Sequence, residues 1–144
     1  MNIAILQAHD VHEALVYNYG EYSDMLQALL TSAMPLVAIE QQATLSFTTF
    51  LANHEQLPEQ LEDFDAYIIT GSKDSVYDDK PWIKNLIGLV QQLDQAKKKL
   101  VGICFGHQLI AQALGGQVEQ SDKGWGIGIK GAKLNQQAIA TQAF

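Results

Sequence analysis

Residues 100–108 read LVGICFGHQ, a short apolar run followed by Gly-x-Cys-x-Gly and then polar residues. This order predicts a β-strand that turns sharply into a helix and lifts one reactive side chain above the sheet, as in a nucleophile elbow. Gly102 and Gly106 fit the pattern because the backbone passes too close at such positions for a Cβ atom. A cysteine suits the turn because its thiolate is a strong nucleophile. We therefore predict that Cys104 is a catalytic nucleophile.

The alternative for Cys104 is a structural role, since free cysteines are often buried and behave as small apolar residues. The chain has one Cys and 11 Gly among 144 residues. Glycines at both flanking positions would then arise by chance in roughly 0.6% of cases, the square of 11/144. The preceding apolar run and the following helical pattern make chance a poorer explanation still, so the pattern favours the nucleophile.

Apolar runs alternate with amphipathic segments along the whole chain. We expect strands over residues 2–6, 45–51, 66–70 and 100–103, and helices over residues 22–33, 81–98 and 106–114. Residues 36–39 and 125–134 are further strand candidates, and residues 135–144 are ambiguous. Strands that alternate with helices predict an α/β fold, a flavodoxin-like three-layer sandwich with a mostly parallel sheet covered on both faces.

Composition narrows the function classes. A net charge of −7 argues against nucleic acid as a partner, and no apolar run is long enough to cross a bilayer. The N-terminus lacks the basic region of a secretory signal, and a single cysteine cannot form an internal disulfide, so a cytoplasmic location is expected. Histidine and cysteine do not occur at metal-ligand spacing, and we expect neither a metal nor a cofactor. Residues 1–144 are interpreted as one domain.

Residues 102–116, GICFGHQLIAQALGG, resemble the signature of class I glutamine amidotransferases. Residues 65–72, DAYIITGS, resemble the strand and turn that supply an oxyanion amide in that family. Residues 75–83 and 19–25 are similar to segments of its stand-alone, GMP-synthase-like members. The resemblance implies that Cys104 attacks the side-chain amide of glutamine, forms a γ-glutamyl thioester and releases ammonia.

Further site residues follow from the elbow and from the resemblance. The N–H of the residue after the nucleophile, Phe105, is one oxyanion donor in an elbow. The resemblance places the second donor at Gly71 or Ser72, and leaves open which, because family members usually carry Gly-Gly or Gly-Pro where this chain has Ser72-Lys73. It also places Gln108 beside the amino-acid end of the substrate.

Two other features near the elbow carry weaker predictions. His107 is interpreted as structural or pocket-lining, because neighbouring residues on a helix point apart. Residues 124–128, GWGIG, resemble the family's segment near the glutamine pocket, although a hairpin with a buried Trp125 explains them equally well.

The family completes its site with a His-x-Glu pair downstream of the cysteine. None of the four histidines of this chain, His9, His12, His54 and His107, begins such a pair. The resemblance therefore implies the first two-thirds of an amidotransferase domain, with its C-terminal part missing and weak activity on its own. A sheet that stops early leaves an unpaired edge, which predicts self-association, most simply as a homodimer.

Three functions remain open at this point. The first is a glutaminase or amidotransferase that delivers ammonia to an acceptor synthetase. The second is a γ-glutamyl peptidase of the same fold, which acts on a γ-glutamyl compound other than glutamine. The third is a non-catalytic interaction module, since the base and its orienting acid are absent from the sequence.

Overall fold

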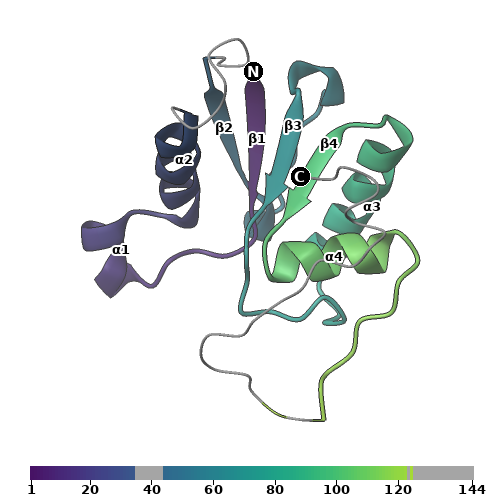
Figure 1. Cartoon of the computed structure of the whole chain (residues 1–144). Helices are drawn as coiled ribbons and strands as arrows, with labels where there is room; N and C mark the ends of the chain where they lie inside the picture. The colour runs from purple at the N-terminus through teal and green to yellow at the C-terminus, as the bar shows by residue number, and fades with distance from the viewer. Residues whose placement is uncertain (35–43, 123, 125–144) are drawn as a thin grey trace, which may run out of the picture.

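The computed structural model describes residues 1–34, 44–122 and 124. Four parallel strands form one sheet in the order β2–β1–β3–β4 (Figure 1). The strands are β1 (Asn2–Gln7), β2 (Ser46–Leu51), β3 (Ala66–Ile69) and β4 (Lys99–Gly102). The four strands predicted over residues 2–6, 45–51, 66–70 and 100–103 are therefore confirmed.

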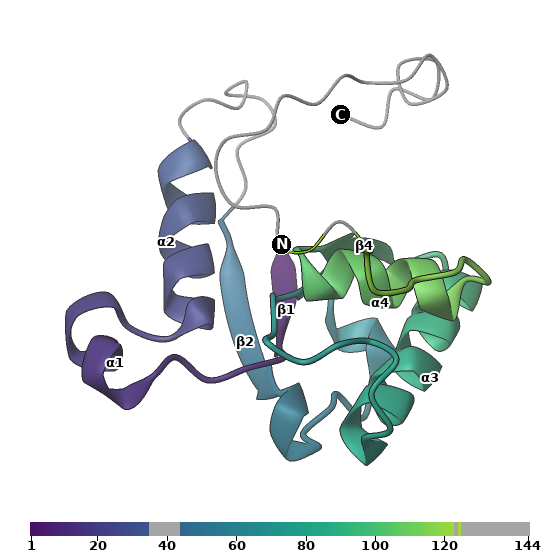
Figure 2. The ribbon, with the colours of Figure 1, turned by 90° about the horizontal axis from the view of Figure 1, so that it is seen from below.

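Helices lie on both sides of this sheet. They are α1 (Glu13–Tyr19), α2 (Tyr22–Ala33), α3 (Pro81–Gln95) and α4 (Phe105–Ala113), with short 3-10 turns η3 (Ala52–His54) and η4 (Leu61–Asp63). Figure 2 shows α2 on one side of the strands and α3 and α4 on the other. This arrangement confirms the predicted three-layer α/β sandwich with a parallel sheet.

The larger core fills the space between the sheet and the pair α3 and α4. Leu6 and Ile69 of the sheet are fully buried there, together with Leu109 of α4. Phe105, the first residue of α4, is 1% exposed and packs against Trp82 of α3 with ring centroids 5.4 Å apart. Burial of such a ring stabilises the fold by about 1.5–3 kcal/mol, so this contact holds the start of α4 in place.

The opposite face of the sheet carries a smaller core. Leu26 and Leu30 of α2 pack there against buried isoleucines of β1 and β3. The apolar stripe of α2 is wider than this contact, because Leu29 remains 61% exposed. Val101 of β4, next to Ile68 in the sheet register, is also exposed on this face. The edge strand β4 therefore presents apolar surface.

Helix α4 lies within one residue of its predicted bounds, whereas α1 and α3 differ more from the prediction. The helix expected to reach residue 98 ends at Gln95, because Lys97 adopts a left-handed φ of 53° and the lysine that follows it leads into β4. Helix α1 was not predicted, and none of its residues is buried. Its first turn is capped by His12, whose Nδ1 accepts the N–H of Ala14 at 3.3 Å.

Some expectations fall outside the described residues. These are the candidate strands over 36–39 and 125–134, the ambiguous segment 135–144, and the glycine-rich stretch 124–128 beyond its first residue. Among the helices that the structure does describe, none has both the length and the apolar character needed to cross a membrane.

Candidate functional site

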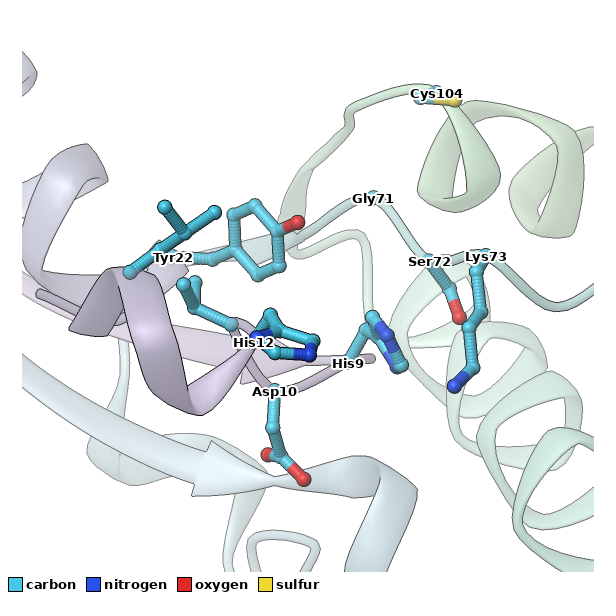
Figure 3. Close-up of a pocket in the computed structure, with 10 residues that line it drawn as sticks. His9, Asp10, His12, Tyr22, Gly71, Ser72, Lys73 and Cys104 are labelled. Atoms are coloured by element: carbon cyan, nitrogen blue, oxygen red, sulfur yellow. The ribbon is translucent and has the colours of Figure 1, made fainter. Parts of the chain in front are cut away.

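The candidate site lies at one edge of the sheet, where the parallel strands β1, β3 and β4 all end. In open α/β sheets ligands bind outside these carboxyl ends, at the point where the strand order reverses. In the order β2–β1–β3–β4 the reversal falls between β1 and β3. A cavity of about 440 Å³ opens there, lined by residues 9–12 after β1, residues 71–73 after β3, and Cys104 after β4 (Figure 3). Leu15 of α1 and Tyr22 of α2 complete the wall that the structure describes.

Cys104 occupies the turn between β4 and α4. It is exposed, and its φ of 52° and ψ of −107° lie in a region that residues with a side chain rarely adopt. The turn is held by hydrogen bonds on both sides, from the Ile103 N–H to the Ile69 carbonyl at 3.0 Å and from the Gln108 N–H to the Cys104 carbonyl at 3.1 Å. Strained backbone of this kind costs of order 1–3 kcal/mol and is concentrated at functional sites.

The two glycines of the motif allow β4 and α4 to come this close. A Cβ atom built on Gly102 would lie 2.4 Å from the backbone carbonyl carbon of Gly106. A Cβ atom on Gly106 would lie 2.5 Å from the carbonyl oxygen of Ile69 on β3. Both distances are below any van der Waals contact, so the close approach requires glycine at each position.

The expected oxyanion donors lie around Cys104. Phe105 is the first residue of α4, so its N–H has no partner within the helix. Gly71 adjoins the cysteine, since a Cβ atom on Gly71 would lie 3.7 Å from the Cys104 Cβ. The Ser72 hydroxyl accepts the N–H of Asp74 at 3.1 Å and so holds the turn that follows β3. The structure therefore brings Cys104, Gly71 and Ser72 to one cavity.

Two polar residues of α4 lie elsewhere. Gln108 and His107 are exposed, and neither belongs to the cavity wall that the structure describes. Gln108 follows Cys104 by one helical turn, and residues four apart lie on the same side of a helix. The substrate-binding role of Gln108 therefore stays a prediction.

The segment after β1 is held against the sheet through Asp10. Its carboxylate oxygen Oδ2 lies 2.8 Å from His54 Nε2 and accepts the side-chain N–H of Asn53 at 3.0 Å. Partial burial alone would raise the pKa of Asp10, but the hydrogen bonds from His54 and Asn53 outweigh it and hold this pKa below its usual value. Through these two contacts, Asp10 links residues 9–12 to the 3-10 turn η3.

A second set of hydrogen bonds, formed by Gln7 and Glu21, holds residues 9–12 in place. Gln7 is 1% exposed, and its Nε2 donates to Glu21 Oε2 at 3.1 Å. The same carboxylate oxygen accepts the Val11 N–H at 2.9 Å, and Gln7 Oε1 accepts the Ser23 N–H at 3.2 Å. Val11 in this segment is thus held by a partly buried contact with Glu21, the residue before α2, and Glu21 is in turn bonded to Gln7 of β1.

Loss of the Asp10 charge is expected to destabilise the protein in a pH-dependent way. A lowered pKa means that the folded state favours the carboxylate, so its contribution is complete above the unfolded value of 3.8 and is lost as pH falls through the folded value. We expect Asp10→Asn to lower the free energy of unfolding near pH 7, measured by urea denaturation, and the difference from wild type to shrink near pH 3. Glu59→Gln, at an exposed acid, is the control; an equal loss in both variants would contradict the prediction.

Sequence reasoning missed the contribution of the segment after β1. His9 and His12 line the same cavity as Cys104, although nothing in their local sequence marks them as site residues. The signal that could have found them is topological, because residues that follow neighbouring parallel strands meet at one edge of the sheet. Among the described residues no group of three His, Cys, Asp or Glu side chains is placed to hold a metal ion.

Comparison with known proteins gives consistent matches. Residues 31–142 match the family model described as glutamine amidotransferase class-I. A glutamine amidotransferase-like protein of Schizosaccharomyces pombe is 39% identical over 131 residues, which cover 88% of this chain and 52% of that protein. Gamma-glutamyl peptidase 5 of Arabidopsis thaliana is 37% identical over 79 residues, covering 55% of this chain and 32% of the peptidase.

Two further matches are more distant. A glutamine-hydrolyzing GMP synthase component of Sulfurisphaera tokodaii is 29% identical over 110 residues, covering 76% of this chain and 50% of that protein. The crystal structure of a Thermotoga maritima glutamine amidotransferase superposes with a TM-score of 0.54 at 18% identity, covering 78% of this chain and 43% of that one. The chain spans about half the length of the curated relatives it matches, or less.

Proposed function

This chain belongs to the class I glutamine amidotransferase family, and from that membership we propose that it cleaves a γ-glutamyl amide bond through Cys104. The observation that carries the proposal is the placement of Cys104, exposed in a strained turn between β4 and α4 on the wall of a cavity. In the proposed reaction the sulfur bonds to the γ-carbonyl carbon, the C–N bond breaks, and the thiol proton leaves with the amine. Water then hydrolyses the thioester to glutamate and restores the thiol.

Both steps pass through a tetrahedral oxyanion, which needs hydrogen-bond donors already in place. We assign this role to the N–H of Phe105 and to an N–H of the Gly71–Ser72 turn, because the former lacks a partner in α4 and the latter adjoins Cys104. Gln108 is proposed to bind the amino-acid end of the γ-glutamyl group, one helical turn beyond the nucleophile. Each donor of this kind is worth about 2.7–4 kcal/mol in the transition state.

The two candidate reactions differ in the amine that leaves the γ-glutamyl group. With glutamine as substrate the product is ammonia, and a synthetase would be the acceptor, as the name of the GMP synthase relative suggests. With a larger γ-glutamyl compound the protein would be a peptidase, which the identity to the Arabidopsis peptidase favours. We propose a cytoplasmic protein in either case, and a homodimer that covers the exposed apolar surface of β4.

Acylation of Cys104 is the step to test, and γ-glutamyl-p-nitroanilide is the probe, because its weakly basic leaving group departs without much help from a general acid. We expect the chain to release about one equivalent of p-nitroaniline and to gain one γ-glutamyl group in its intact mass. The adduct should be cleaved by hydroxylamine, as a thioester is.

Cys104→Ala is the control for this experiment and should show neither release nor adduct. Iodoacetamide provides the second measurement, since an exposed Cys104 should be alkylated in the native protein. A native chain that is alkylated rapidly but never acylated would support a non-catalytic module and would overturn the proposed function.

A further inference from the structure

The cavity beside Cys104 is larger than the release of ammonia requires. We propose that it binds the leaving-group side of the substrate and that Lys73 recognises a carboxylate there. The substrate would then be a γ-glutamyl amino acid or peptide rather than glutamine. This inference rests on the proposed function, because it assumes that Cys104 cleaves a γ-glutamyl bond.

The charge of Lys73 is available to a ligand. Lys80, Lys84 and Lys97 each form an ion pair with an aspartate, whereas Lys73 has none among residues 1–34, 44–122 and 124. Its sequence neighbour Asp74 is already bonded to Lys80, with Nζ and Oδ2 2.7 Å apart. In a chain of net charge −7, an unpaired ammonium on a cavity wall favours an anionic ligand.

No other group on the described wall neutralises this charge. Asp10 is the acid among the lining residues, and its carboxylate is engaged by His54 and Asn53. Figure 3 shows that Asp10 points away from Lys73, whereas the ring of His9 and the side chain of Lys73 extend toward the same space from opposite walls. A carboxylate between them would meet donors from both.

The size and lining of the cavity suit an amino-acid side chain. Its volume of about 440 Å³ lies within the range of sites for small molecules, about 300–1,000 Å³. Val11, Leu15 and Tyr22 contribute apolar side chains to the cavity lining. An ammonia molecule would use none of this surface.

The cavity is also free for the leaving-group side. The amino-acid end of the γ-glutamyl group is proposed to bind Gln108, which does not line the described cavity. A substrate held by Gln108 on one side of Cys104 would place its amide nitrogen, and what is attached to it, on the other. In the acylation step that nitrogen takes the thiol proton and leaves as a free amino acid or peptide, its carboxylate still opposite Lys73.

Protection of Cys104 from alkylation tests the proposal without requiring turnover. The full chain is treated with iodoacetamide in the presence of γ-glutamylglycine or γ-glutamylmethylamide, which share the γ-glutamyl group and differ in the carboxylate of the leaving group. We expect γ-glutamylglycine to give half-maximal protection at a roughly 3- to 10-fold lower concentration, since charge-assisted contacts at a partly exposed site are of this strength.

The variant Lys73→Met should remove that difference and leave protection by γ-glutamylmethylamide unchanged. Lys99→Met is the matched control, because Lys99 is an exposed lysine at the other end of β4, and it should behave as wild type. Equal protection by both compounds in the wild type would overturn the role of Lys73 and leave the proposed function standing. Protection by neither compound would overturn both.

Discussion

Replacement of Gly102 by alanine is expected to abolish stable folding or to cost at least about 3 kcal/mol of unfolding free energy. The added Cβ would lie 2.4 Å from the carbonyl carbon and oxygen of Gly106 and 2.5 Å from the His107 nitrogen. All three are backbone atoms, so no side chain can rotate away and α4 must separate from β4. Gly106→Ala should be similarly damaging, because its Cβ would meet Ile69. Urea denaturation followed by circular dichroism measures the loss.

Gly88→Ala is the matched control for this substitution. Gly88 lies in the middle of α3, and no atom lies within 4 Å of the position that its Cβ would take. Alanine is a better helix former than glycine, so this variant should be unchanged or more stable by about 0.5–1 kcal/mol. A Gly102→Ala protein as stable as Gly88→Ala would mean that strand and helix do not meet in a tight turn.

The second large effect is expected in glutamine turnover. The 144-residue sequence carries no His-x-Glu pair after Cys104. Members of a catalytic triad act as a unit, so the loss of one can cost nearly as much as the loss of all. We therefore expect this chain to hydrolyse glutamine several orders of magnitude more slowly than a relative that has the pair. Ammonia release, measured for both proteins at equal concentration, provides the comparison.

Cys104→Ala sets the background of that assay. Turnover well above this background would contradict the expectation, provided that the intact mass of the protein corresponds to a chain that ends at Phe144. It would also point to a base within the chain, and His9 and His12 are the histidines that line the cavity with Cys104. His9→Gln and His12→Gln would then identify which of them removes the thiol proton.

The strands and their order of appearance could be predicted because each is recognisable from its own residues. A strand covered on both faces is a short continuous apolar run, as in residues 66–70 and 100–103. Helix α3 begins at Pro81 and carries a complete apolar period, so its start was predicted correctly. Helix α1 buries none of its residues, and its position depends on contacts that no periodic pattern records.

The part of the candidate site around Cys104 could also be predicted from residues that are neighbours in the sequence. The glycines around Cys104 reveal a turn in which backbone passes backbone, and a requirement for glycine is visible in sequence because no other residue lacks a Cβ. The neighbours Gly71 and Ser72 needed the resemblance to a family. Their position beside Cys104 follows from the pairing of β3 with β4.

What the sequence by itself determined is therefore the fold class and the position of Cys104, since both are recognised from patterns of residues that lie close together in the chain. Only the tertiary structure decided what faces the cysteine. His9 and Lys73 lie 64 positions apart in the chain, and they share a cavity because β1 and β3 are parallel neighbours whose ends coincide. Strand order is set by packing over the whole sheet, so the environment of the thiol had no local signature.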